Sequence, residues 1–209
     1  IATLPEIVRL AKTYGARVMV DDAHGLGTLG KGGRGTPSHF GLEQEVDVYM
    51  GTFSKSLASL GGYMAGKSRI VDYVRHNSRP FIFSASVPPA SCAAALAALN
   101  VLEEEPELPE RLLRLSDFFR EALKQRGMSI RESRTPIVPI FTYTADRTLR
   151  IAMELYKQGL FVNTVLPPAA PADGCMLRTS LMATLTESLL EEAADILSRV
   201  FSMPEYAMK

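Results

Sequence analysis

Hydrophobic and polar residues in the first half of the chain follow two periods in turn. Positions 4–14 carry apolar residues every three or four places, which predicts an amphipathic helix, and Thr3 and Glu6 have the spacing of a capping box at its start. Short apolar runs predict buried strands, and longer periodic runs predict further helices. The strands expected here are 17–21, 46–51 and 61–66, and the further helices are 67–77 and 88–104. Because strands alternate with helices, the pattern predicts a parallel α/β sheet.

The second half of the chain has a different pattern. The charged, proline-containing segment 103–109 predicts a domain boundary, which divides the chain into residues 1–105 and 106–209. The helices expected after it are 108–126, 147–158 and 187–201, and the strands are 128–133, 137–143, 161–165 and 176–181. One stripe of the first of these helices is expected in the core, and it consists of Leu112, Leu115, Phe119 and Leu123. This order of elements predicts a smaller α+β domain.

Composition narrows the class of protein. The 209 residues include 23 Lys and Arg against 23 Asp and Glu, so the net charge of zero argues against nucleic acid as a partner. No apolar run is long enough for an integral membrane segment. The two cysteines, Cys92 and Cys175, make no disulfide framework, which favours a cytoplasmic location.

Acidic and imidazole side chains follow the first predicted strand. Asp21, Asp22 and His24 come where that strand ends, and ligands in open α/β sheets bind outside the carboxyl ends of strands. The group could bind a metal ion or hold a heteroaromatic cofactor, or the aspartate could simply cap a turn. The glycines of 25–30 match a dinucleotide-binding pattern, but the Lys- and Gly-rich 31–37 predicts no helix to meet a pyrophosphate.

A lysine and several hydroxyls follow the second predicted strand. Partial desolvation of Lys55 would favour the neutral amine that forms Schiff bases, and the hydroxyls of Thr52, Ser54 and Ser56 could bind a phosphate. The alternative is a lysine that faces solvent in a loop. A hydrolytic pair of Ser54 and Lys55 is disfavoured because adjacent strand residues point to opposite faces. Arg178, inside a later strand, could bind a carboxylate or could face water on an edge strand.

Taken together, these motifs resemble a known family. The string VDDAHGLGTLGKGGRG, with GTFSKS, FIFSASVPPA and LRTSLMAT further on, is similar to the α-oxoamine synthases, which use pyridoxal 5'-phosphate (PLP). The resemblance implies an α/β fold of the PLP-dependent transferase fold type I. Residues 1–105 would form the C-terminal part of its large domain, a mostly parallel sheet with helices on both faces. Residues 106–209 would form the small C-terminal α+β domain.

The resemblance also assigns roles around the cofactor. Lys55 would form the Schiff base with PLP and move protons at the substrate α-carbon. Asp21 would pair with the pyridinium nitrogen and keep it protonated, so that the ring acts as an electron sink. His24 would bind the ring phenolate oxygen, and Thr52 would bind the phosphate. The resemblance thereby favours a cofactor over a metal at Asp21 and His24.

Two further residues receive roles from the family. Ser84, in FIFSAS, would offer its hydroxyl to the cofactor phosphate of the neighbouring subunit, since the family is homodimeric. Arg178 would hold the carboxylate of the amino-acid substrate. The implied enzyme is a PLP-dependent acyl-CoA:amino acid C-acyltransferase, most similar to the serine palmitoyltransferase branch. The 8-amino-7-oxononanoate synthase and 2-amino-3-ketobutyrate CoA ligase branches are the alternatives.

Family members run to about twice the length of this chain, and a glycine loop and a stacking ring of their first half have no counterpart here. We therefore expect the chain to be the C-terminal half of such an enzyme and to be inactive alone. Two other classes stay open. One is a catalytically incomplete fragment or a partner subunit without activity of its own, and the presence of Lys55 argues against the version of such a subunit that lacks this lysine. The other is a metal hydrolase that uses Asp21, Asp22 and His24.

Overall fold

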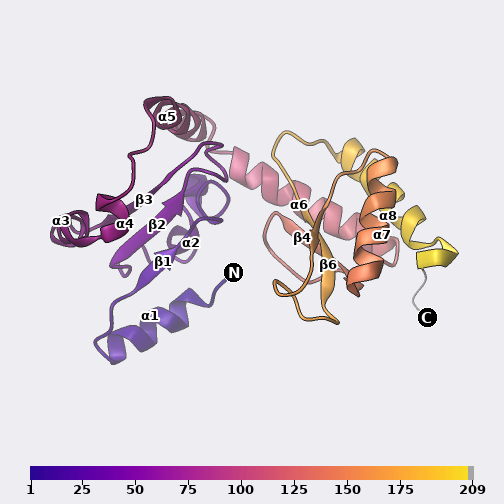
Figure 1. Ribbon diagram of the computed structural model, residues 1–209, viewed down its shortest axis with the longest axis horizontal. Coiled ribbons are helices and arrows are strands. Elements are labelled where there is room, and N and C mark those ends of the chain that lie inside the picture. The colour runs from indigo at the N-terminus through magenta and orange to yellow at the C-terminus, as the bar shows by residue number, and fades with distance from the viewer. Residues whose placement is uncertain (207–209) are drawn as a thin grey trace. The chain divides into compact units, whose positions relative to one another are not determined.

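The computed structural model describes residues 1–206 of the chain (Figure 1). The chain forms two compact units, Ile1–Glu110 and Arg111–Lys209. The long helix α6 (Leu108–Gln125) begins in the last residues of the first unit and continues into the second. Of the helices that the structure describes, none is both long and apolar enough to cross a membrane.

The first unit contains the alternating elements expected from the pattern. Its strands and main helices lie within a few residues of the predicted ranges. The elements are α1 (Leu4–Thr13), β1 (Met19–Asp21), η1 (Lys31–Gly33), α2 (Thr36–His39), β2 (Val48–Thr52), β3 (Gly62–Gly66), α3 (Ser68–Asn77), α4 (Arg79–Ile82) and α5 (Pro89–Glu104). The short η1, α2 and α4 were not predicted, and η1 forms within a segment for which no helix was expected. Elements of three or four residues are too short to show a hydrophobic period.

The sheet of the first unit has the order β1-β2-β3. β1 and β2 are parallel, with Asp21 opposite Met50, whereas β3 runs antiparallel to β2. The prediction of a parallel sheet is therefore correct for β1 and β2 and wrong for β3. The connection 53–61 is too short for a crossover, since parallel neighbours need a dozen or more residues between them.

The core of the first unit is small. Its buried cluster comprises Leu4, Val8, Val18 and Val46 and lies between α1 and the start of the sheet. α5, all of whose residues are described, buries only Ala95. The predicted capping box is wrong, because the Glu6 carboxylate pairs with Arg9 at 2.6 and 3.0 Å, and among residues 1–206 the Thr3 side chain makes no cap hydrogen bond.

The second unit packs helices on an antiparallel sheet. Its remaining elements are β4 (Ile137–Tyr143), α7 (Ala145–Lys157), β5 (Asn163–Val165), β6 (Cys175–Ser180), α8 (Glu187–Phe201) and η2 (Pro204–Tyr206). The sheet order is β4-β6-β5, and both pairs are antiparallel. The strand predicted at 128–133 is wrong, since only the single bridge between Ile130 and Ile140 forms there. The Ser133 hydroxyl accepts the N–H of Thr135 at 3.1 Å, and such local bonds compete with a ladder.

The core of the second unit is larger and confirms the predicted helix stripe. Leu112, Leu115, Phe119 and Leu123 are all buried. They pack in one cluster with residues from β4, β6, α7 and α8, among them Val138, Ile140, Ile151, Leu155, Leu177 and Leu197. The 3.6-residue period of α6 was therefore a reliable guide to its buried face.

Candidate active site

The ends of β1 and β2 define one edge of the first sheet. Because the two strands are parallel, residues that follow Asp21 and Thr52 leave the sheet on the same side. Asp21 is exposed, and one of its carboxylate oxygens accepts the N–H of Ala23 at 3.1 Å. This contact is the turn-capping bond considered above, and it occupies a single oxygen. The structure thus brings Asp21 to the edge where α/β sheets bind ligands.

His24 lies in the turn that follows β1. The carbonyl of Asp22 accepts the N–H groups of Gly25 and Leu26 at 3.0 and 3.1 Å, so the chain reverses sharply at this point. The carbonyl of His24 accepts the hydroxyl of Thr28 at 2.7 Å. These bonds hold the backbone of His24, and the residue is exposed beside the end of β1.

Asp22 has a structural role that the sequence did not indicate. It is only 6% exposed, and its two carboxylate oxygens accept the N–H and the hydroxyl of Thr36 at 2.7 and 2.6 Å. A Cβ at Gly25 or Gly35 would overlap this carboxylate, and Gly35 also has a φ of +98°. Both oxygens of Asp22 are therefore committed to the glycine-rich loop. The only sign of this role in the sequence is a glycine followed by a hydroxyl residue, Gly35 and Thr36, in the loop after Asp22.

For this reason Asp21, Asp22 and His24 do not together form the metal site that the sequence left open. Asp22 was one of its three members, and its carboxylate is used within the loop. Within residues 1–206, no three His, Cys, Asp or Glu side chains come together as a metal site would require.

The hydroxyl of Thr52 lies at the end of β2 in a network of short contacts. Its Oγ1 donates to the carbonyl of Gly61 at 3.0 Å, lies 2.9 Å from the Ser54 Oγ and accepts the Ser54 N–H at 3.3 Å. Two residues after Ser54, the Ser56 hydroxyl donates to the carbonyl of Leu26 at 2.8 Å. That bond joins the loop after β2 to the loop after β1, so the two candidate segments form one surface.

Lys55 lies in this loop after β2. Its carbonyl accepts the N–H of Ala58 at 3.1 Å, and Ala58 has a positive φ of 46°, so the chain turns tightly here. The side chain is exposed, so the alternative of a lysine that faces solvent in a loop is correct and the partial desolvation is wrong. Over the described part of the chain, no carboxylate lies within ion-pairing distance of its amine. The amine is accordingly available to an added ligand.

A tyrosine from β3 packs beside this edge. The ring of Tyr63 lies over Gly51, where a Cβ would approach it to 2.5 Å, and stacks with Phe53 at a centroid distance of 6.1 Å. Burial, and to a smaller extent the negative charge of Asp22, raise the pKa of Tyr63. The phenol stays neutral at physiological pH and contributes a flat wall beneath the loop.

The other two predicted residues lie elsewhere in the chain. Ser84 is exposed in the segment after α4, in the first unit. Arg178 is in the second unit, on β6, where its register partners are Pro139 on β4 and Asn163 on β5. β6 is the central strand, so the edge-strand alternative is wrong. Arg178 is half-buried on the face opposite to the buried side chains of Leu177 and Thr179.

Comparison with known proteins defines the class. The sequence model of the aminotransferase class I and II family matches residues 1–197, and the chain belongs to that family. It is 45% identical over 205 residues to a serine palmitoyltransferase of Sphingobacterium spiritivorum, covering 98% of this chain and 51% of that protein. It is 46% identical over 202 residues to an 8-amino-7-oxononanoate synthase of Citrifermentans bemidjiense, covering 96% and 52%.

A solved structure extends the likeness to the fold. The structure is a serine palmitoyltransferase with a PLP internal aldimine, which superposes with a TM-score of 0.91 at 34% identity, over 96% of this chain and 51% of that one. The expected fold, α/β of the PLP-dependent transferase type I, is thereby confirmed. The names of the relatives confirm the resemblance to the α-oxoamine synthases. The chain spans about half the length of the relatives it matches.

Proposed function

We propose that this chain carries part of the active site of a PLP-dependent acyltransferase, which condenses an amino acid with an acyl-CoA to give an α-oxoamine. The observation that carries the proposal is the edge of the first sheet. There, Thr52 ends β2 and is followed by Lys55, and Asp21 ends the parallel strand β1 and is followed by His24. Ligands of α/β sheets bind at such an edge, and these four side chains suit PLP.

The groups present fit the cofactor one by one. A carboxylate at Asp21 has an oxygen outside its turn bond to receive the ring N–H, and the His24 imidazole suits the phenolate oxygen. The Thr52 hydroxyl, which here donates to the carbonyl of Gly61 and lies 2.9 Å from the Ser54 hydroxyl, would turn from that carbonyl to bind the phosphate. The exposed amine of Lys55 has no ion-pair partner among residues 1–206 and suits the carbonyl carbon. Ser84 is proposed to serve the phosphate of a neighbouring subunit in a homodimer.

Each of the proposed site residues would have its own role in the reaction. PLP, when bound, supplies an electron sink for a carbanion at the substrate α-carbon. Lys55 would hold the cofactor and then remove the α-proton with its amine. Asp21 would keep the ring nitrogen protonated, and Arg178 would fix the amino-acid carboxylate with its planar guanidinium. Residues 1–105 would form part of the large domain, and 106–209 the small domain.

The amino-acid and acyl-CoA substrates are a separate part of the proposal. The 45% and 46% identities to the two named activities differ too little to decide between them. We propose serine palmitoyltransferase as the activity, because GTFSKSLASLGG, SHFGL and SLMAT resemble that branch. The alternatives are the 8-amino-7-oxononanoate and 2-amino-3-ketobutyrate enzymes. Glycine, L-alanine and L-serine tested with acyl-CoAs of different chain length would separate them. We also propose a cytoplasmic location, which cell fractionation tests.

Selective labelling of Lys55 tests the proposed function. The chain is incubated with PLP and borohydride, and peptide mass spectrometry measures the labelling of each lysine. We expect Lys55 to be labelled well above Lys67, an exposed lysine before α3 that serves as the internal control. Asp21→Ala should reduce labelling at Lys55 and leave Lys67 unchanged. This comparison reads out even weak binding, which we expect because Asp21, His24 and Lys55 are all exposed.

Equal labelling of Lys55 and Lys67 would contradict the cofactor assignment. It would favour the second candidate, a partner subunit without activity of its own. Lys55 argues against that candidate, because a subunit without a catalytic role has no need of an amine at the end of β2.

A further inference from the structure

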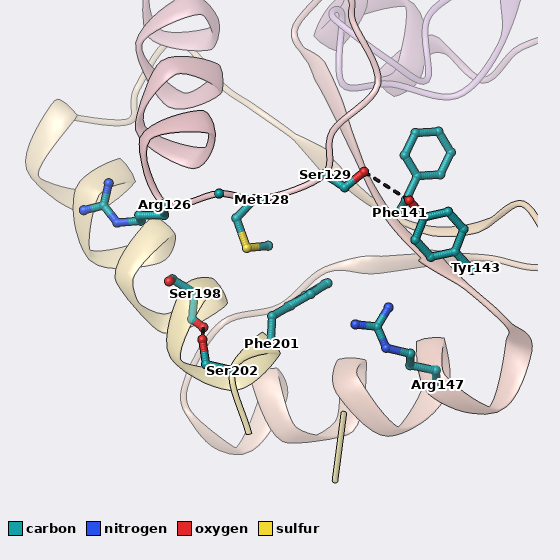
Figure 2. A pocket seen from close by; sticks show the side chains of 10 residues that line it. Arg126, Met128, Ser129, Phe141, Tyr143, Arg147, Ser198, Phe201 and Ser202 are labelled. Carbon is teal, nitrogen blue, oxygen red and sulfur yellow. Dashed lines mark hydrogen bonds between the residues drawn. The ribbon is translucent and has the colours of Figure 1, made fainter. Parts of the chain in front are cut away.

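The second unit contains a cavity that the proposed function does not use. Its volume is about 270 Å³, and it opens between the end of α6, strand β4, and helices α7 and α8 (Figure 2). It is lined by Arg126, Gly127, Met128, Ser129, Phe141, Tyr143, Arg147, Ser198, Phe201 and Ser202. The volume lies just below the range of roughly 300 to 1,000 Å³ of most small-molecule sites.

Among the described residues, one guanidinium at this cavity has no carboxylate partner. The Nε of Arg147 donates to the carbonyl of Tyr206 at 2.8 Å, and its Nη1 donates to the carbonyl of Thr142 at 3.1 Å. In residues 1–206, no carboxylate lies within 4.0 Å of Arg147. The guanidinium is half-buried, and this burial lowers its pKa. Two carbonyl contacts leave donors of the five-donor fork unused.

The other arginine at the cavity differs in charge and direction. Arg126 pairs with Glu191 at 2.6 Å and with Asp195 at 2.7 Å, so its charge is neutralised. Figure 2 shows its guanidinium pointing away from the cavity, whereas that of Arg147 points between Tyr143 and Phe201. The cation of Arg147 is thus the one that faces the open space among the lining residues described.

The walls beside Arg147 are aromatic. The guanidinium lies 5.3 Å from the centroid of the Phe201 ring, and the rings of Phe141 and Tyr143 stack at 5.6 Å. Tyr143 has a φ of +70° and follows a bulge in β4. A residue other than glycine rarely adopts this conformation, and strain of this kind concentrates at binding sites. The irregular end of β4 therefore directs a flat ring into the cavity wall.

We propose that this cavity binds a small organic anion with a single carboxylate on a flat, apolar body. The unused donors of Arg147 would receive the carboxylate, and the rings of Tyr143 and Phe201 would enclose the apolar part. Ser198 also lines the cavity, and the hydroxyl of Ser129 lies 3.2 Å from that of Tyr143 and holds this ring in the wall. The inference goes beyond the acyltransferase, because every lining residue belongs to the second unit and none is assigned to the cofactor.

Benzoate is a suitable probe, with benzamide as its neutral counterpart of the same shape. Both are titrated into the isotopically labelled chain, and NMR shifts of the lining residues are followed. We expect benzoate to bind at least about tenfold more tightly than benzamide, because charge-assisted hydrogen bonds contribute more than neutral ones. Inorganic phosphate, which has charge without an apolar body, should bind more weakly than benzoate. Equal affinity of benzoate with benzamide or with phosphate would overturn the proposal.

Three variants locate the binding. Arg147→Gln removes the charge, and Ser198→Phe places a ring in the cavity while it keeps the bonds of Arg147. Both should reduce benzoate affinity about tenfold or more. Arg199→Gln is the control, because this exposed arginine of α8 contacts Gln158 and does not line the cavity. Thermal unfolding shows whether each variant is folded. If Ser198→Phe is folded and binds benzoate normally, or if the wild-type chain does not bind it, the proposal fails.

Discussion

Two adjacent aspartates at the end of β1 have opposite roles. Asp21 is exposed at the sheet edge, whereas Asp22 is buried and accepts two hydrogen bonds from Thr36. Consecutive residues of an extended chain point to opposite sides, so one of the pair can face a ligand only if the other faces inward. The pair therefore separates a binding residue from the residue that holds the loop behind it.

This difference is directly measurable as stability. Asp22→Ala leaves the N–H and hydroxyl of Thr36 without their acceptor, and it should lower the free energy of unfolding by about 1–3 kcal/mol. Asp21→Ala removes an exposed carboxylate and should change it by less than about 0.5 kcal/mol. Urea denaturation of both variants checks the prediction. Similar losses for the two would show that the buried network does not hold the loop.

Asp47 carries a pH-dependent part of the stability of the first unit. Its carboxylate accepts the N–H of Val18 at 2.9 Å, which lowers its pKa, and Arg17 at 2.9 Å lowers it further. A folded-state pKa below the unfolded value of about 3.9 stabilises the fold above that pH. The contribution is lost as the pH falls through the lower, folded-state value.

Asp47→Asn should therefore be less stable than the wild type at pH 7, and the difference should narrow below about pH 4. Urea unfolding across this range provides the measurement. Asp173→Asn is the control, because within residues 1–206 this exposed carboxylate has no hydrogen bond or ion pair. If the difference in unfolding free energy between the wild type and Asp47→Asn stayed constant down to acid pH, the Asp47 carboxylate would not be the source of this pH dependence.

At the scale of elements, the hydrophobic period of the sequence predicted those helices that pack one face into a core. The long helices were found because their buried stripes repeat every three or four residues, as α6 shows. The antiparallel direction of β3 follows from the short connection 53–61, which the hydrophobic pattern does not indicate. Residues 128–133 do not form a strand, because local side-chain hydrogen bonds compete with the strand ladder there. Short elements such as α2 arise from loop contacts, which a hydrophobic pattern does not encode.

The candidate site was predictable to a similar extent. Asp21, His24, Thr52 and Lys55 could be placed at one edge because parallel strands end on the same side. The bond between Asp22 and Thr36 joins residues far apart in a glycine-rich loop, where no period connects them. The sequence left open whether Lys55 is partly desolvated or faces solvent, since burial depends on the whole packed surface around a residue.

Helix capping offers a matched pair of threonines in the second unit. Thr186 begins α8 and accepts the N–H of Leu189 at 3.3 Å. Thr144 begins α7 with nearly the same backbone angles, but in the described part of the chain its side chain makes no cap hydrogen bond. Thr186→Ala should therefore cost about 1 kcal/mol of unfolding free energy, and Thr144→Ala clearly less. Equal costs in urea denaturation would contradict this account.

At the scale of the whole molecule, the two units differ in how much apolar surface they bury. Within residues 1–206, the buried cluster of the second unit has sixteen members, whereas that of the first has four. The first unit also leaves large apolar side chains exposed, among them Met19, Phe81, Ile82, Phe83, Leu96 and Val101. The first unit therefore has less buried apolar surface to stabilise it than the second.

This imbalance predicts that the first unit opens before the second. Hydrophobic burial is the main favourable term in folding, so amides of β1 and β2 should exchange hydrogen faster than those of β4 and β6. Hydrogen exchange followed by mass spectrometry at low urea concentration measures both. Leu197→Ala, in the larger cluster, should speed exchange in the second unit and lower its stability by about 2–5 kcal/mol. Val8→Ala should act on the first unit alone. If both variants changed exchange in both units equally, the chain would unfold as one cooperative body, and the separate cores would not set its stability.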